Sequence, residues 1–168
     1  MKVKDLIAEG YSFTQEKSCM DINIIHNFLS KYSTWAVDIS KDMVKKSMEN
    51  SMCFAILHNG SLVGFSRVIT DKVTFANLVD VFVLPAHRGK GLSLWITKEV
   101  ISHPDLTGLR RFTLATTTAK WLYEKFGFKS LSNPETFMEI YVPNIYKNIN
   151  PISTNVAERQ NIQSLEQN

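Results

Sequence analysis

Residues 81–93 read VFVLPAHRGKGLS, and they predict a strand, a glycine-rich turn and the start of a helix. The run 73–84 is rich in β-branched and aromatic residues and nearly continuous in apolarity, which is typical of a central strand buried on both faces. After the turn, apolar residues recur at helical spacing from Leu92 to Ser102, and Pro104 ends the pattern. The middle of the chain is therefore a strand–turn–helix unit.

Such a turn can hold an anion. The N-terminus of a helix gathers free backbone N–H groups at one point and adds the positive end of the helix dipole. Gly89 and Gly91 allow the backbone to approach a ligand closely, while Arg88 and Lys90 add two positive charges. The unit predicts a pyrophosphate site, although a glycine-rich turn with solvated basic residues is the alternative. Neither a Walker A loop nor a Rossmann fingerprint is present.

The flanking segments predict a mixed α/β domain. Asn59-Gly60 between the apolar runs 52–58 and 62–70 is a strong hairpin signal. Other stretches with helical spacing are 20–30, capped by Ser18 or Asp21, 40–50, capped by Ser40, and 116–126, which ends at Gly127. Further strands are expected over 11–14, 111–115 and 137–142.

Composition narrows the function classes. The 168 residues correspond to about one domain, and 19 basic against 16 acidic residues give a net charge of +3, too small an excess for a nucleic-acid stripe. The two cysteines and four histidines lack metal-ligand spacing, so no metal site is expected. The start of the chain does not resemble a signal peptide, and no apolar run is long enough to span a membrane. A cytoplasmic protein without a membrane or nucleic-acid partner is expected.

The composition changes near the end of the chain. From Pro143 the residues are polar and rich in Asn and Gln, which divides the chain into a folded domain, 1–143, and a polar tail, 144–168. Within the tail, Asn155 and Glu158 resemble a capping box and predict a weak helix.

Two motifs together resemble the GNAT superfamily of acyl-CoA-dependent N-acyltransferases. The family's V-x-P and [QR]-x-x-G-x-[GA] patterns match Val83, Pro85, Arg88 and Gly91, with Ser93 at the last position. Its later A-x-x-[LF]-Y-x-[KR]-x-G-F pattern matches Ala119, Leu122, Tyr123, Lys125, Gly127 and Phe128. The resemblance extends over about residues 11–142. It implies the GNAT α/β (α+β) fold: a central mixed sheet of about six to seven strands, splayed at the acyl-CoA site and flanked by about four helices.

The resemblance also implies an activity. The expected reaction is transfer of an acetyl group from acetyl-CoA to a primary amine of a small molecule, by direct attack in a ternary complex. The implied acetyl-CoA-binding residues are Val81, Phe82 and Val83 for the pantetheine, and Arg88, Gly89, Lys90, Gly91, Leu92 and Ser93 for the pyrophosphate. Thr116 stands where the family often has Asn, on the pantetheine side of the site.

Two residues are candidates for catalysis. Tyr123 matches the family's general acid, although its place on an apolar stripe also fits a core aromatic. Asp80 is a carboxylate in an apolar strand, which suggests a general base, or a structural partner of Arg67 on the neighbouring strand. Glu139 and His87 are weaker candidates for the base.

The acceptor side is less defined. Tyr32 and Trp35, in the irregular segment 31–39, and Glu139 on the last predicted strand are expected to bind the acceptor. A protein or peptide N-acetyltransferase and a non-catalytic acyl-CoA-binding module are the alternative functions. Retention of both Arg88 and Tyr123 argues against the module, and a homodimer is a state that the resemblance allows.

Overall fold

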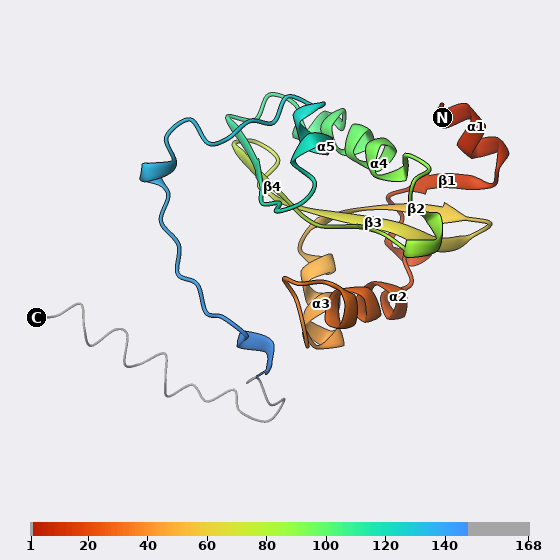
Figure 1. Cartoon of the computed structure of the whole chain (residues 1–168), viewed down its shortest axis with the longest axis horizontal. Helices are drawn as coiled ribbons and strands as arrows, with labels where there is room; N and C mark the ends of the chain where they lie inside the picture. The colour runs from red at the N-terminus through yellow and green to blue at the C-terminus, as the bar shows by residue number, and fades with distance from the viewer. Residues whose placement is uncertain (1, 148–168) are drawn as a thin grey trace, which may run out of the picture.

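A computed structural model describes residues 2–147, in which five strands form one sheet in the order β1-β2-β3-β4-β5 (Figure 1). The first four strands are antiparallel neighbours, and β5 pairs with β4 in parallel. The strands are β1 (Tyr11–Thr14), β2 (Met52–His58), β3 (Ser61–Thr70), β4 (Phe75–Val83) and β5 (Arg111–Leu114). Tail residues 148–168, including the helix predicted near Asn155, lie outside the described residues.

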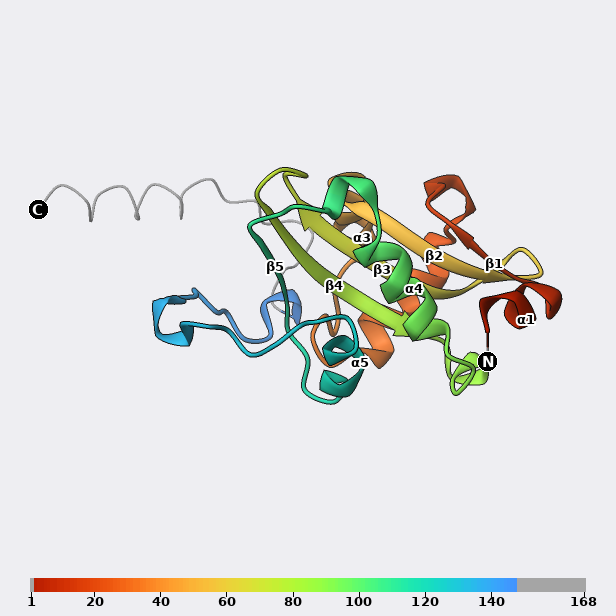
Figure 2. The ribbon, with the colours of Figure 1, turned by 90° about the horizontal axis from the view of Figure 1, so that it is seen from above.

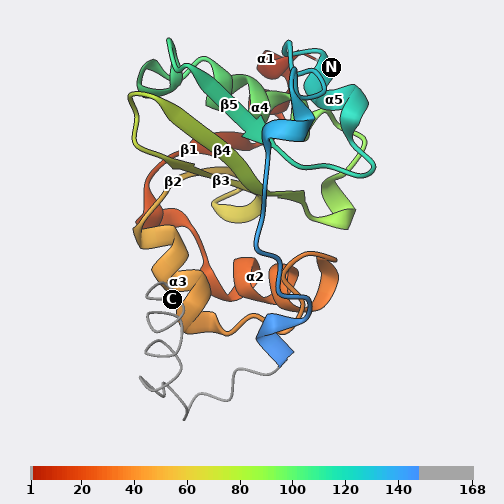
Figure 3. The ribbon, with the colours of Figure 1, turned by 90° about the vertical axis from the view of Figure 1, so that its left-hand side faces the viewer.

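Helices cover both faces of this sheet. The helices are α1 (Val3–Ala8), α2 (Ile22–Asn27), α3 (Lys41–Glu49), α4 (Leu92–Ile101) and α5 (Lys120–Glu124). Figures 1 and 3 show α4 and α5 on one face and α2 and α3 on the other. None of the described helices is long and apolar enough to cross a bilayer.

Alternation along the inner strands builds two apolar cores. In β2, Phe54 and Ile56 face the core beneath α4, while Ala55 and Leu57 face the core against α2 and α3. Successive strand residues point to opposite faces, so a continuous apolar run fills both cores at once. The α4 stripe of Leu92, Trp95, Ile96 and Val100 is buried on the first core.

The predicted hairpin turn and the caps at Asp21 and Ser40 are confirmed, whereas the helix predicted over 116–126 is shorter and runs from Lys120 to Glu124. Asn59 and Gly60 have φ values of 49° and 82°, and two positive φ values in sequence are what a type I′ hairpin turn requires. The Asp21 side chain accepts from the Asn23 N–H, and the Ser40 hydroxyl accepts from the Met43 N–H. These bonds fix where α2 and α3 begin.

Three details differ from the expectations. The sheet has five described strands rather than about six or seven, because 137–142 pairs with no strand in the described chain. The stretch 20–30 is divided into α2 and a π-helical turn, Phe28–Tyr32. One short helix, α1, was not expected; its N-terminus is closed by the Asp5 carboxylate, which accepts from the Lys2 N–H.

Candidate active site

The main cavity lies where β4 and β5 separate. Their parallel pairing runs only from Phe75 beside Arg111 to Leu78 beside Leu114, after which β4 continues to Val83 paired with β3 but not with β5. Figure 2 shows the two strands side by side, with α4 crossing the sheet next to them. A cavity of about 820 Å³ occupies the opening, and the residues of β4 from Asn77 to Val83 form one wall.

A β-bulge redirects β4 inside this opening. Phe65 is opposite Phe82 and Arg67 is opposite Val79, so Asp80 and Val81 together oppose a single residue of β3. Asp80 has a φ of 55°, in the left-handed region that Asp tolerates better than most side chains. A bulge bends its strand and changes the direction of a side chain. The Asp80 carboxylate consequently lines the cavity.

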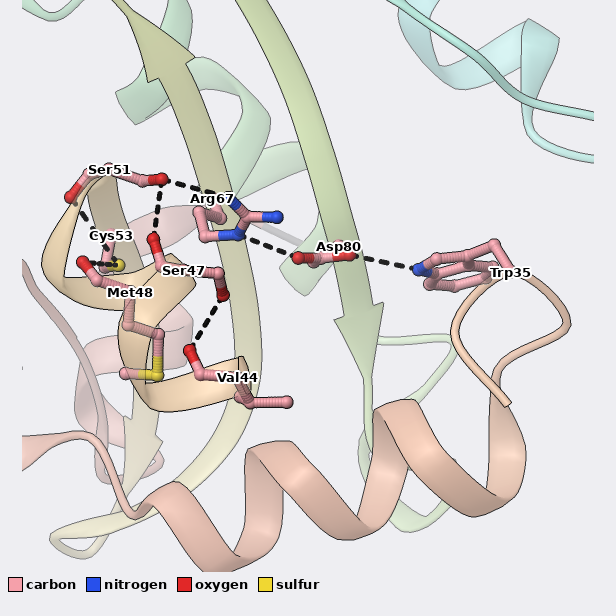
Figure 4. A network of polar contacts seen from close by, with 8 residues as sticks. All are labelled: Trp35, Val44, Ser47, Met48, Ser51, Cys53, Arg67 and Asp80. Carbon is pink, nitrogen blue, oxygen red and sulfur yellow. Dashed lines mark hydrogen bonds and ion pairs between the residues drawn. The ribbon is translucent and has the colours of Figure 1, made fainter. Parts of the chain in front are cut away.

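Asp80 is held at both carboxylate oxygens (Figure 4). The Arg67 Nε donates to its Oδ2 at 2.8 Å, and the Trp35 indole N–H donates to its Oδ1 at 3.1 Å. Arg67 also donates to the Ser51 hydroxyl at 2.9 Å. The Arg67 and Asp80 side chains are only 13% and 10% exposed, so breaking the pair would leave a mostly buried charge without its partner.

The glycine-rich turn also contributes to the lining of the cavity. Gly89 and Gly91 have φ values of 77° and 86°, and Gly91 caps the N-terminus of α4. A Cβ built at either glycine would meet no atom within 4 Å, so the backbone conformation, not crowding, requires glycine there. The first turn of α4, with its free N–H groups, begins directly after Gly91 in this lining.

The two basic residues of the turn, Arg88 and Lys90, have different partners. The Arg88 Nε donates to the Val83 carbonyl at 3.0 Å, and Arg88 lines the cavity. The Lys90 ammonium instead contacts the Glu9 carboxylate at 3.2 Å, and Lys90 is not among the lining residues. The pairing with Glu9 raises the pKa of Lys90. One of the two predicted basic residues therefore belongs to the lining of the cavity, and the other is paired with Glu9 at the end of α1.

Tyr123 lies on the far wall of the same cavity. Its position in α5 buries the ring, and that burial raises the pKa of its hydroxyl. Within residues 2–147, no hydrogen bond engages this hydroxyl. Thr116, in the segment before α5, also lines the cavity, but its hydroxyl accepts from the Ala119 N–H at 3.1 Å.

Of the three residues predicted to bind the acceptor, two line the cavity and one does not. Tyr32 and Trp35 line the cavity from the far end of the π-helical turn and the loop after it, both with exposed rings. Trp121, which sequence reasoning missed, is a third exposed aromatic on the lining. Glu139 is exposed and is not a lining residue. Met138 and Ile140, on either side of it, are almost fully exposed, so this part of the chain lies away from the cavity walls.

His87 lies near the turn, within a cluster of rings. Its Nδ1 is 2.9 Å from the Tyr11 hydroxyl, and its ring centroid is 5.2 Å from that of His58. Burial lowers the pKa of His87, and the nearby His58 and Lys90 lower it further, so its neutral form dominates at pH 7. In the part of the chain that the structure describes, no three His, Cys, Asp or Glu side chains meet as metal ligands.

Most of the residues expected to bind acetyl-CoA meet in this one cavity. The lining includes Val81, Phe82, Val83, Arg88, Gly89, Gly91, Leu92, Ser93 and Thr116, together with Asp80 and Tyr123. The sequence offered Arg67 as a possible partner of Asp80, as the alternative to a base, and gave no sign of the contact from Trp35. Those residues are 45 positions apart, and no local pattern links them.

The chain is similar in sequence and in structure to proteins assigned as acetyltransferases. A family model described as "Acetyltransferase (GNAT) domain" matches residues 12–142. A Gibberella zeae protein assigned as an acetyltransferase, FG08082, is 30% identical over 137 residues, which cover 68% of this chain and 76% of that protein. A crystal structure from Xanthomonas campestris, of a protein assigned to the GNAT family, has 46% identity and a TM-score of 0.79, covering 81% of this chain and 96% of that one.

More distant structures share the fold. Glucosamine-6-phosphate N-acetyltransferase from Arabidopsis thaliana has 17% identity and a TM-score of 0.56, covering 78% of this chain and 97% of that one. A Clostridium acetobutylicum protein assigned as an acetyltransferase, whose structure contains acetyl-CoA, has 13% identity and a TM-score of 0.56, covering 78% of this chain and 94% of that one.

Proposed function

Since the chain belongs to the GNAT family of acetyltransferases, we propose that it transfers the acetyl group of acetyl-CoA to the primary amine of a small molecule. The observation that carries the proposal is the cavity between β4 and β5. Residues of the glycine-rich turn before α4, Asp80 and Tyr123 are all among the residues that line it. Each of these groups meets a different need of acetyl transfer.

The backbone of β4 and of the start of α4 is proposed to bind acetyl-CoA. Beyond Leu78, no strand of residues 2–147 lies beside β4 on the β5 side, so an extended pantetheine arm can pair with Val81–Val83 as an added strand would. The turn at Gly89 and Gly91 and the N-terminus of α4 offer free N–H groups to the pyrophosphate. Arg88 contributes the cation on the cavity side.

The transfer step needs a base, an oxyanion site and an acid. A primary amine with a reference pKa of about 10.4 is protonated at neutral pH, and it must lose a proton before its nitrogen can attack the thioester carbonyl. Asp80 is the proposed acceptor of that proton. A backbone N–H of residues 82–84 is the proposed donor to the carbonyl oxygen as it becomes anionic. As the C–S bond breaks, Tyr123 gives its proton to the departing thiolate. The attacking nitrogen, positively charged after attack, returns one proton to the Tyr123 phenolate, which leaves the neutral amide and the free thiol.

The lining of the cavity favours a small apolar amine. Among the described residues that line the cavity, Asp80 is the one carboxylate, and Tyr32, Trp35 and Trp121 contribute three exposed aromatic rings. A basic peptide would be recognised by several acidic side chains, which the described part of the lining does not have. A single carboxylate with aromatic walls suits one amino group on an uncharged body.

The compartment and the assembly form part of the proposal. We propose a cytoplasmic enzyme, because its donor is a cytoplasmic metabolite and because both Cys19 and Cys53 are free thiols. We also propose that the chain works as a homodimer.

Acetyl-CoA affinity tests the role of the turn. We expect Arg88→Ala to raise the Kd for acetyl-CoA about 10- to 100-fold, since hydrogen bonds to charged groups contribute about 1.5–3 kcal/mol. Calorimetry on the purified chain measures this change. Arg110→Ala, which removes an exposed arginine outside the cavity, is the matched control and should leave the Kd unchanged. An unchanged Kd for Arg88→Ala would remove this residue from the binding site.

Asp80→Asn separates the two roles of that carboxylate. We expect kcat to fall about 10²–10⁴-fold, with the acetyl-CoA Kd retained, because an amide cannot take the proton. The melting temperature should fall as well, since Arg67 loses its ionic partner. Arg67→Met removes the same ion pair but keeps the carboxylate, so it should lower the melting temperature as well and retain more activity per folded molecule than Asp80→Asn. If Asp80→Asn keeps its activity per folded molecule, Asp80 only positions its neighbours and the base lies elsewhere.

An acceptor screen tests the function as a whole. The purified chain is supplied with acetyl-CoA and a panel of aromatic amines, aliphatic amines and lysine peptides, and thiol release and product mass are recorded. We expect turnover with a small aromatic or apolar amine. Acetylation of the peptides alone would favour a protein N-acetyltransferase, and acetyl-CoA binding without turnover on any amine would favour a non-catalytic module.

A further inference from the structure

Trp35 makes a contact that acceptor binding does not require. Its indole N–H donates to Oδ1 of Asp80 at 3.1 Å, while the Arg67 Nε donates to Oδ2 at 2.8 Å. Figure 4 shows the two donors on opposite sides of the carboxylate. A ring that only packed against a bound amine would use its face and not its N–H group. The bond to Asp80 therefore points to a second role for the indole.

The fold gains little from an indole in this place. The Trp35 residue is 53% exposed, whereas the side chain of Asp80 is only 10% exposed. An apolar side chain stabilises the folded chain in proportion to the area that it removes from water, and an exposed ring removes less of it than a core residue does. The indole thus contributes more to the surroundings of the carboxylate than to the apolar core.

The backbone on both sides of Trp35 is fixed. The Ser33 hydroxyl donates to the Leu29 carbonyl and accepts from the Ala36 N–H at 3.1 Å. Ala36 and Ile39 are buried in the core against α2 and α3. Because the loop is held before and after the tryptophan, it presents the indole N–H in a set direction.

The same segment of the chain also reaches the second oxygen of the carboxylate. Ser51, which follows α3, accepts from the Arg67 guanidinium at 2.9 Å and donates to the Ser47 carbonyl at 2.8 Å. Arg67 in turn donates to Oδ2 of Asp80. The segment from Trp35 to Ser51 therefore holds both carboxylate oxygens, one directly and one through Arg67.

We propose that Trp35 is a positioning residue, whose indole N–H orients the Asp80 carboxylate toward the amine. The inference rests on the proposed function, in which Asp80 accepts a proton from that amine. The last torsion of an aspartate side chain is broad, so a single donor on one oxygen leaves the plane of the carboxylate free to turn. A second donor on the other oxygen fixes that plane. Displacement of a reacting group by about 1 Å can cost about 10²-fold in rate.

Trp35→Phe tests this role, because it keeps an aromatic ring and removes the N–H donor. We expect kcat with the best amine of the acceptor screen to fall about 10- to 100-fold, with the KM for the amine and the Kd for acetyl-CoA nearly unchanged. Trp95→Phe is the matched control. It removes an indole N–H that donates to the Glu99 carboxylate at 3.0 Å, both residues lying outside the described lining of the cavity, and it should keep kcat per folded molecule. An unchanged kcat for Trp35→Phe, with or without a rise in the KM for the amine, would overturn the positioning role.

A double substitution shows whether the effect acts through Asp80. When Trp35→Phe is added to Asp80→Asn, kcat should fall less than about 2-fold further, because no carboxylate remains to be oriented. An equal fall in the parent and in the Asp80→Asn background would mean that the indole N–H acts on the substrate directly, and the proposal would then be wrong.

Indole N–H resonances of the ¹⁵N-labelled chain test the contact without turnover. The chain has three tryptophans, and replacing each in turn assigns its resonance. Asp80→Asn should move the Trp35 resonance upfield, since a hydrogen bond to a charged acceptor is stronger than one to a neutral amide, and should leave that of Trp95 in place. A Trp35 resonance that stays in place would overturn the positioning role even if the chain acetylates amines. A parent chain that acetylates no amine would overturn the proposed function, and the positioning role with it, whatever the resonance does.

Discussion

Tyr123→Phe is expected to lower kcat for acetyl transfer about 10²–10⁴-fold and to leave the KM for acetyl-CoA nearly unchanged. Burial raises the pKa of the Tyr123 hydroxyl, so it keeps its proton at neutral pH and can give it to the departing thiolate. Because phenylalanine preserves the buried ring against its neighbours in the core, the melting temperature should change little. Steady-state kinetics with the best amine of the acceptor screen measures the effect.

Two controls isolate proton transfer from packing. An acyl donor with a more acidic leaving thiol needs less help from an acid and should recover part of the rate lost by Tyr123→Phe. Tyr11→Phe makes the same change at another buried tyrosine, where the hydroxyl bonds His87 instead of facing the reaction, and should lower stability more than kcat. Turnover of Tyr123→Phe at the parent rate would reduce Tyr123 to a core aromatic.

Features encoded by neighbouring residues could be predicted from the sequence. Asn59-Gly60 specifies its turn because both positions need positive φ, and Ser40 specifies the start of α3 because its hydroxyl satisfies a free N–H. The pair of Asp80 and Arg67 was one of two alternatives from the sequence, since a carboxylate in an apolar strand is expected either to line a cleft or to have a charged partner.

Features set by distant contacts could not be predicted. The left-handed conformation of Asp80 arises from a bulge against β3, and the residue types around this position do not predict such a bulge. Lys90 was expected in the pyrophosphate site, but Glu9, 81 positions earlier, draws its ammonium away. The segment 137–142 has the pattern of a strand but no partner in the described chain, because alternation specifies a face to be buried and not the chain that buries it.

Gly91→Val is expected to raise the Kd for acetyl-CoA at least about 100-fold, more than the loss of the Arg88 side chain. Gly91 has a φ of 86°, and a β-branched residue held there is strained by about 1–3 kcal/mol. Space is not the obstacle, because a Cβ at this position meets no atom within 4 Å. To relieve this strain, the turn must change conformation. That change redirects the N–H groups at the start of α4, which are proposed to bind the pyrophosphate. Each hydrogen bond to a charged group contributes about 1.5–3 kcal/mol.

A second glycine provides the matched control. Gly108 has a φ of 75°, a Cβ there also meets no atom within 4 Å, and it lies in the turn before β5 outside the cavity lining. Gly108→Val should therefore lower the melting temperature by a similar amount while the acetyl-CoA Kd stays at the parent value. Calorimetry and thermal melting on both variants give the comparison. Equal losses of affinity in the two variants would trace the effect to general destabilisation, and the turn at Gly91 would then have no particular role in holding the pyrophosphate.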